Sequence, residues 1–378
     1  MMRYTTADAI LADARARRAQ FEEAKRAQEA VWRKVPGARP PLLLSVRTET
    51  ELPPYSTKQT HYDREKMLIS QLPAFASSVR GSGCVPSVRA NMGCGIFATP
   101  LGIRQELYDD KMPWVQERLP RETIARLTPD DIRIPEDPST EFGAGLAAMR
   151  YMAGALEGTG GMVFPLDLQS PFTLAHLCFG DDIFYEVYDD PEFVAHLCEL
   201  TLDAVIKGFD ACLSVMPDAE RYVAHYNNLV IPRDMGGIKL SEDTSTLLSE
   251  PLLREFTEPF MNRLFDRFDG GYVHYCGQNA HLYDLVLRTP KAWGLNFGNP
   301  EKHDMPKVLG ELAAADKIYY GALPMENPEE PYADFVRYLR ASYRDGVFHL
   351  LLAFSCGEER RERVLEDWER AVDAVIKA

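Results

Sequence analysis

The chain lacks any run of about 18 uncharged apolar residues, the length that a transmembrane helix needs. Its first residues, MMRYTTADAILADARARR, contain no apolar core of signal-peptide length. The chain also lacks a disulfide pattern. Its seven cysteines are odd in number, are dispersed and show no short, regular spacing. These absences predict a cytoplasmic protein that has no membrane segment and no disulfide scaffold.

Basic residues are fewer than acidic ones. The chain has 42 Lys and Arg residues and 57 Asp and Glu residues, which give a net charge of -15. Nucleic acid is therefore not an expected partner, since phosphate contacts need clustered basic residues. The 378 residues, 46% of them hydrophobic, are enough for one large barrel with extensions or for two ordinary domains. This balance favours small-molecule substrates and a partner protein with a basic patch.

Two nucleotide-binding signatures are missing as well. No GxGxxG follows the first apolar run, and no GxxxxGK[ST] occurs anywhere. The chain therefore has neither the dinucleotide fingerprint nor the P-loop.

What the chain does contain is an alternation of apolar β-runs and helical stretches after an N-terminal helix predicted over residues 6–34. Such an order predicts a parallel sheet. We expect an α/β protein with a TIM (β/α)8 barrel over residues 41–378 and an N-terminal helical extension over residues 1–40, a doubly wound open sheet being the alternative. The predicted strands include residues 42–46, 84–91, 162–168, 222–231, 271–276, 293–297, 318–323 and 348–354.

His274 and Cys276 lie two residues apart in the apolar segment GYVHYCG. Side chains at i and i+2 of a strand point to the same face, so one imidazole and one thiolate can reach one ion. Cys356 ends another β-run, VFHLLLAFSC, and the carboxyl ends of barrel strands meet where active sites are built. Three N and S ligands with an open fourth position predict a catalytic zinc site. The alternative is that all three are core residues, two buried thiols and a hydrogen-bonded histidine.

Four further residues are weaker candidates for catalysis, and their only support is a place at or near the end of a predicted strand. The alternative for Asp234, in IPRDMGG, is a turn or helix-cap aspartate. The four candidates are Asp167, Asn227, Asp234 and Asn296.

Several segments resemble the uroporphyrinogen decarboxylase superfamily in the same order along the chain. They are SPFTLAHLCFGDDIFYEVYDDPEFVAHLCELTLDAVI at 170–206, STLLSEPLLREFTEPFMNRLFD at 245–266, the stretch from VHYCG to PEKHD at 273–304 and IYYGAL at 318–323. The resemblance covers roughly residues 160–356 and implies a TIM barrel.

Two branches of that superfamily differ in their motifs. True decarboxylases carry an Arg-rich R-Q-A-G-R signature near the N-terminus, which this chain lacks. The corrinoid-dependent methyltransferases, such as those acting on coenzyme M, hold zinc with His-x-Cys and a later Cys before a Gly. His274, Cys276 and Cys356 match that pattern.

The resemblance thus implies a zinc-dependent methyltransferase that moves a methyl group between a corrinoid, carried by a cobalamin protein, and a zinc-activated thiol or a small methylated substrate. Two alternatives stay open. One is a metal-free decarboxylase or lyase of the same superfamily, and the other is a non-catalytic barrel that binds a tetrapyrrole or a partner protein. The oligomeric state is also open, a homodimer being one option.

Overall fold

The computed structural model of the chain describes residues 3–378, except for the side chain of residue 227. Its largest sheet has six parallel strands in the order β10, β11, β12, β13, β16, β2. Their bounds are β2 Leu43–Val46, β10 Ile238–Ser241, β11 Gly271–Tyr275, β12 Ala292–Phe297, β13 Ile318–Gly321 and β16 Leu350–Cys356.

Two more parallel strands, β4 (Ser87–Arg89) and β7 (Met162–Phe164), pair with each other. A bridge between Gln169 and Ser241 joins the segment after β7 to β10, so eight parallel strands follow one another around the core. Between β2 and β4 the described residues form only one antiparallel bridge, from Leu44 to Ser82. The predicted parallel α/β architecture is confirmed, but the hydrogen-bonded ring of a closed barrel is not found, and the strands form an open, barrel-like arrangement.

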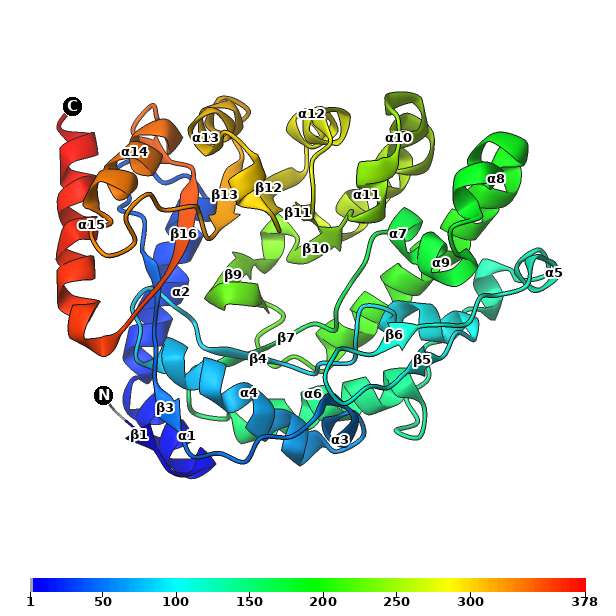
Figure 1. Cartoon of the computed structure of the whole chain (residues 1–378), viewed down its shortest axis with the longest axis horizontal. Helices are drawn as coiled ribbons and strands as arrows, with labels where there is room; N and C mark the ends of the chain where they lie inside the picture. Colours follow the sequence, from blue (N-terminus) through cyan, green and yellow to red (C-terminus); the bar gives the residue numbers. More distant parts are fainter. Residues whose placement is uncertain (1–2) are drawn as a thin grey trace.

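Helices surround these strands on the outside (Figure 1). The longer ones are α4 Arg64–Val79, α6 Glu141–Ala155, α7 Pro171–Phe179, α9 Pro191–Ser214, α10 Glu250–Phe256, α11 Glu258–Phe268, α12 Ala280–Arg288, α13 Met305–Ala314, α14 Tyr332–Ser342 and α15 Arg361–Ile376. Short elements complete the chain: β1 Arg3–Tyr4, β3 Glu49–Thr50, α3 Thr57–Thr60, β5 Gln105–Glu106, β6 Trp114–Val115, α5 Arg121–Ile124, α8 Ile183–Asp189, β14 Tyr343–Arg344 and β15 Val347–Phe348. No helix among residues 3–378 is both long enough and apolar enough to cross a bilayer.

Strand residues alternate between two hydrophobic cores, because successive side chains of a strand point to opposite faces. The inner core, enclosed by the strands, contains Leu43, Tyr272, Ile318, Tyr320 and Leu351. The outer core, between strands and helices, contains Leu44, Val273, Tyr319, Leu350 and Leu352. The parity of a residue within its strand therefore decides whether its side chain can face the interior.

The predicted N-terminal helix is divided at Arg17 into α1 (Ala7–Ala16) and α2 (Arg18–Trp32). Helix α2 is no peripheral addition, since its last residue, Trp32, belongs to the inner core. The Trp32 indole N–H also donates to the carbonyl of Val230 at 2.9 Å. The predicted boundary near residue 40 stays a prediction, but helix α2 and the strands share one core.

The predicted strand over residues 222–231 is wrong. The segment is an antiparallel hairpin of β8 (Tyr222–His225) and β9 (Leu229–Pro232), turned at Tyr226–Asn228. The parallel strand in this region is β10, which the sequence analysis did not identify. Gly236 just before it has φ +96°, and a Cβ there would lie 1.4 Å from the carbonyl oxygen of Gly270. Only glycine permits this approach between β10 and the start of β11.

Candidate active site

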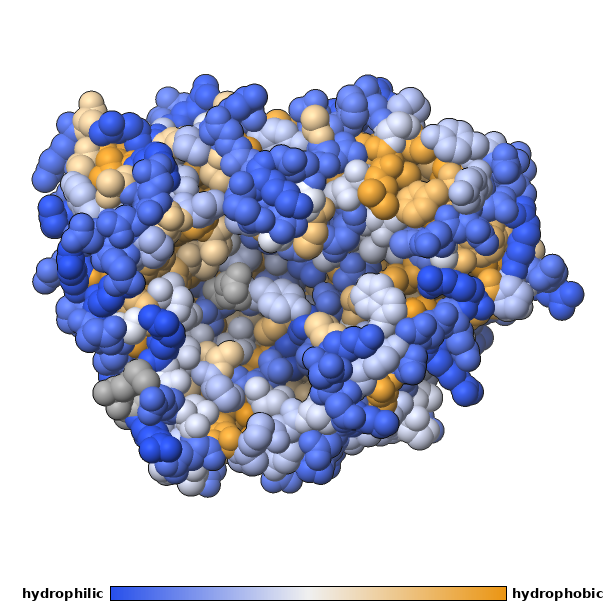
Figure 2. Space-filling model, in the orientation of Figure 1, coloured by the Kyte–Doolittle hydropathy of each residue, from blue (hydrophilic) through white to orange (hydrophobic). Residues whose placement is uncertain are grey.

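A cavity of about 740 Å³ lies at the carboxyl ends of strands β10, β11 and β12. Side chains from these strands, from β13, from helix α7 and from the segments after β4 and β7 line it. Figure 2 shows that this side of the molecule is hollowed near its centre. The carboxyl ends of parallel barrel strands are where such folds build their active sites.

The predicted pair His274 and Cys276 faces this cavity, with Nε2 of His274 lying 3.8 Å from Sγ of Cys276. A third side chain joins them, because Asp243 follows β10, the strand next to β11. One ligand atom from each of the three residues lies within 4.8 Å of the other two. The site thus brings together a nitrogen, a sulfur and an oxygen donor.

Asn296, at the end of β12, sets the orientation of His274. Its side-chain Nδ2 donates to the carbonyl of Tyr320 at 2.6 Å, so Oδ1 faces the imidazole Nδ1, also at 2.6 Å. An amide oxygen only accepts, so Nδ1 carries the proton and Nε2 presents its lone pair to Cys276 and Asp243. Such a partner for the second ring nitrogen is typical of metal-bound histidines.

The electrostatics of the group favour an added cation. Burial and the nearby Asp243 carboxylate together raise the pKa of Cys276 to about 11. Burial also lowers the pKa of His274, as does the charge of Lys239. The imidazole is therefore neutral at pH 7, and a cation would replace the thiol proton.

Asp243 also holds the strand end in place, since its Oδ1 accepts the backbone N–H of Cys276 at 2.7 Å. The donors suit zinc by their chemistry and charge, and their ligand atoms lie within 4.8 Å of one another. Zinc–ligand bonds of about 2.0–2.3 Å put tetrahedral ligand atoms roughly 3.3–3.8 Å apart, which agrees with the 3.8 Å between His274 and Cys276. One thiolate and one carboxylate would balance the two positive charges of the ion. A fourth position would face the cavity.

Cys356 is not part of this group, and its role as third ligand stays a prediction. It is fully buried and packs in the outer core with Leu350 and Leu352, whereas the neighbouring Leu351 faces the inner core. In the register of β16 with β2 it stands opposite Val46, another outer-core residue. β12 and β13 also separate β16 from β11. In this structure the side chain therefore packs on the outer face of the sheet.

Of the four weaker candidates, Asn296 and Asp167 line the cavity. The Asp167 side chain is 13% exposed and forms ion pairs with Arg89 and Lys239, at 3.3 and 3.2 Å. Asp234 does not reach the cavity, because its exposed carboxylate forms two hydrogen bonds with Arg33, at 2.9 and 3.0 Å. The side chain of Asn227 lies outside the described residues.

Three charged residues of this region escaped the sequence analysis: Arg89, Lys239 and Asp243. The last two come from IKLSED at 238–243, which begins with the missed strand β10. Its alternation of Ile and Leu with Lys and Ser, after Gly236 and Gly237, is the pattern of a half-polar strand and was the available signal.

Neither the protein-family models nor the curated proteins include a match to this chain. Among solved structures, a methyltransferase from Methanosarcina mazei is similar, with a TM-score of 0.60 and 12% sequence identity. The alignment covers 93% of this chain and 98% of the other. At this identity the similarity shows a shared fold, and it extends over nearly the whole chain. The resemblance to the uroporphyrinogen decarboxylase superfamily has no support from a sequence match.

Proposed function

We propose that the chain is a zinc-dependent methyltransferase that moves a methyl group between a corrinoid, carried by a partner protein, and a sulfur or oxygen atom of a small substrate. One observation carries this proposal: His274, Cys276 and Asp243 meet at the wall of a large cavity at the carboxyl ends of the strands. The shared fold with a methyltransferase agrees with it. The ligand set differs from the predicted one, with Asp243 in place of Cys356.

A zinc ion in this group would supply the positive charge that keeps a substrate sulfur or oxygen atom ionised near neutral pH. The protein's own residues set up the site. Asn296 keeps the His274 proton on Nδ1, and Asp243 holds the backbone after β11 in place. The side chains that line the cavity then position the substrate so that its reacting atom reaches the open position.

In either direction of methyl transfer, one bond to the methyl carbon forms and one breaks, so each electron pair has a place. When the substrate accepts the methyl group, its heteroatom supplies the electron pair of the new bond to carbon. The pair of the broken cobalt–carbon bond stays on cobalt, which changes from Co(III) to Co(I). In the reverse direction Co(I) supplies the pair, and the substrate heteroatom leaves with the pair of the broken bond.

A metal-free decarboxylase or lyase is the second candidate. It is favoured by Arg89 and Lys239, two cations in the same region that would suit a carboxylate substrate. Metal content separates the two candidates, because the lyase needs none.

The decisive experiment is elemental analysis of protein purified without oxygen and reconstituted with zinc. We expect one zinc per chain in the wild type and in Cys356→Ser, and none in Cys276→Ser. The same three proteins are then assayed for loss of the methylcobalamin absorption band with candidate methyl acceptors. Zinc that binds Cys276→Ser as well as wild type, or that binds neither, would remove the metal from the proposal.

A further inference from the structure

A buried carboxyl group stands directly before the candidate ligand Asp243. It belongs to Glu242, which is 1% exposed. Its neighbours Ser241 and Asp243 both line the cavity, whereas Glu242 does not. The Glu242 side chain therefore reaches into the protein behind the site, where burying a carboxyl group is costly unless hydrogen bonds satisfy it.

Two serine hydroxyl groups satisfy the Glu242 carboxylate. Ser170 Oγ donates to Oε2 at 2.7 Å, and Ser245 Oγ donates to the same oxygen at 2.5 Å. Both serines are fully buried, and the Thr257 hydroxyl donates in turn to Ser245 Oγ at 3.1 Å. Over residues 3–378 Glu242 forms no ion pair, so hydroxyl groups take the place of a cation.

These serines belong to two other segments that line the cavity. Ser170 is the N-cap residue of α7, which contributes Thr173 and His176 to the cavity wall. Ser245 lies in the short 3₁₀ helix that follows Asp243. The Glu242 carboxylate thus joins the end of β10 to the start of α7 and to the turn after the candidate ligand.

The main chain at Glu242 is bonded to β11 as well. Its backbone N–H donates to the carbonyl of His274 at 2.8 Å. One residue later, Oδ1 of Asp243 accepts the backbone N–H of Cys276 at 2.7 Å. Glu242 is therefore fixed to β11 through its main chain and to α7 through its side chain. Binding groups must be held within about 0.5 Å of their productive geometry, and such a two-sided attachment provides that.

An apolar side chain of similar size could fill the same space without the cost of burying a carboxyl group, so the directional hydrogen bonds are what glutamate adds here. We infer that Glu242 is a positioning residue of the candidate zinc site. Its carboxylate, anchored by the two serine hydroxyls, holds the main chain so that Asp243 lies beside the other two ligands. The inference rests on the proposed function, because the property that Glu242 controls is the affinity for zinc.

Zinc affinity tests the inference without an activity assay. It is measured by competition with a chromophoric chelator, well below the thermal transition of each variant. Glu242→Met keeps the length of the side chain but removes the acceptor, so zinc should bind about 10- to 100-fold more weakly. Glu242→Gln keeps an oxygen that accepts from hydroxyl groups and should stay close to the wild type. A loss in Glu242→Gln as large as that in Glu242→Met would overturn the anchoring by hydroxyl groups.

The matched control is Asp334→Leu. It also removes a buried carboxylate, 4% exposed, but this one lies in α14 and does not line the cavity. The variant should lower the thermal transition and leave the zinc affinity unchanged. A loss of zinc affinity equal to that of Glu242→Met would overturn the inference, because any buried carboxylate would then have the same effect.

A double-mutant cycle separates positioning from general support of the fold. If Glu242 acts through Asp243, Glu242→Met should weaken zinc binding much less in an Asp243→Ala background than in the wild-type background. The same fold-loss in both backgrounds would overturn the inference. If Glu242→Met does not fold, Ser245→Ala replaces it in the same cycle. It removes one of the two hydroxyl donors and should give a smaller loss that again depends on Asp243.

The two proposals fail in different ways. A wild type that binds no zinc would overturn the metal-dependent function together with this inference. Zinc that binds through Cys276 with equal affinity in the wild type and in Glu242→Met would leave the methyltransferase standing and remove Glu242 from its metal site.

Discussion

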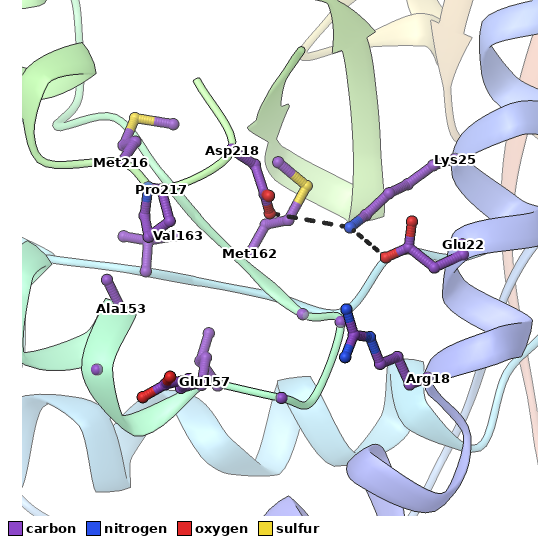
Figure 3. Close-up of a pocket in the computed structure, with 15 residues that line it drawn as sticks. Arg18, Glu22, Lys25, Ala153, Glu157, Met162, Val163, Met216, Pro217 and Asp218 are labelled. Carbon is purple, nitrogen blue, oxygen red and sulfur yellow. Dashed lines mark hydrogen bonds and ion pairs between the residues drawn. The ribbon is translucent and has the colours of Figure 1, made fainter. Parts of the chain in front are cut away.

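Two cavities on this molecule contain buried lysines, and these lysines differ in the number of carboxylates that pair with them. The second cavity, of about 390 Å³, lies between helix α2, the glycine-rich segment from α6 to β7 and the segment before β8. Its Lys25 is 4% exposed, lies 2.9 Å from a Glu22 oxygen and 3.8 Å from an Asp218 oxygen (Figure 3). In the larger cavity, Lys239 shares the carboxylate of Asp167 with Arg89, which is buried and does not line that cavity.

The difference separates a structural cavity from a candidate active site. The second cavity lies where β7 begins, at the end of the strands where barrel-like folds hold residues for stability. Its lysine has two carboxylate partners. Among residues 3–378, the group of close metal-ligand atoms lies in the first cavity. The convergent donors mark the site better than cavity shape does.

The largest expected effect is the loss of the metal donors of the first cavity. Cys276→Ala and His274→Ala should each abolish zinc binding and lower the rate of methyl transfer by at least about a thousandfold, since each removes a ligand. Metal content and the decay of the methylcobalamin band measure both effects. Because both side chains face the cavity, the thermal transition should stay near that of the wild type.

The matched control is Cys356→Ala. It removes a thiol from the outer core, so it should destabilise the fold by about 1–2 kcal/mol and leave zinc content unchanged. Loss of zinc in this variant would place Cys356 among the ligands after all and contradict the assignment of Asp243.

This contrast between two cysteines also shows how far the sequence alone could lead. The spacing of His274 and Cys276 predicted their common face correctly, because the period of a strand is local. For Cys356 the sequence leaves open which face of β16 points inward. That parity depends on register with the neighbouring strands, and the run VFHLLLAFSC is apolar on both faces and does not reveal it.

The missed strand β10 has a different cause. It has four residues, and two of them, Lys239 and Ser241, are polar because they face the cavity. The neighbouring run at 222–231 is more apolar and therefore has the pattern of a strand, although its turn at Tyr226–Asn228 makes it a hairpin. Functional strands at a polar cavity are the ones that hydrophobic patterning detects least well.

A smaller effect is expected from Asn296, which contacts His274 but not the ion. Asn296→Leu removes the acceptor for Nδ1 and should weaken zinc binding by about 10- to 100-fold. Competition with a chromophoric chelator measures the affinity. Asn296→Asp keeps an acceptor and should stay close to the wild type. If both variants bind zinc like the wild type, the imidazole does not depend on this contact.

Acid should lower the stability of the fold through His225. His225, at the end of β8, is fully buried, with Nε2 2.8 Å from the carbonyl of Gly237, and burial lowers its pKa to about 3, assisted by the charge of Lys239. A pKa below the unfolded value near 6.5 means that the unfolded state binds the extra proton first. The contribution of His225 to the free energy of unfolding is complete above pH 6.5 and is lost as the pH falls toward 3. The loss is about 2 kcal/mol between pH 7 and 5.

Urea unfolding at pH 7 and pH 5 measures this loss. His225→Gln keeps a donor for Gly237 but cannot titrate, so its unfolding free energy should fall less over the same interval. An identical fall in wild type and variant would assign the acid sensitivity to other groups.

The smallest effect is expected in the second cavity. Lys25→Met frees two carboxylates, but the side chains of Glu22 and Asp218 are 33% and 49% exposed and can hydrate. We therefore expect a loss of about 1 kcal/mol or less in unfolding free energy, with zinc content and methyl transfer unchanged. Lys239→Met should show the reverse, an altered rate of methyl transfer, because Lys239 lines the larger cavity. If Lys25→Met instead changed methyl transfer, the second cavity would not be a structural one.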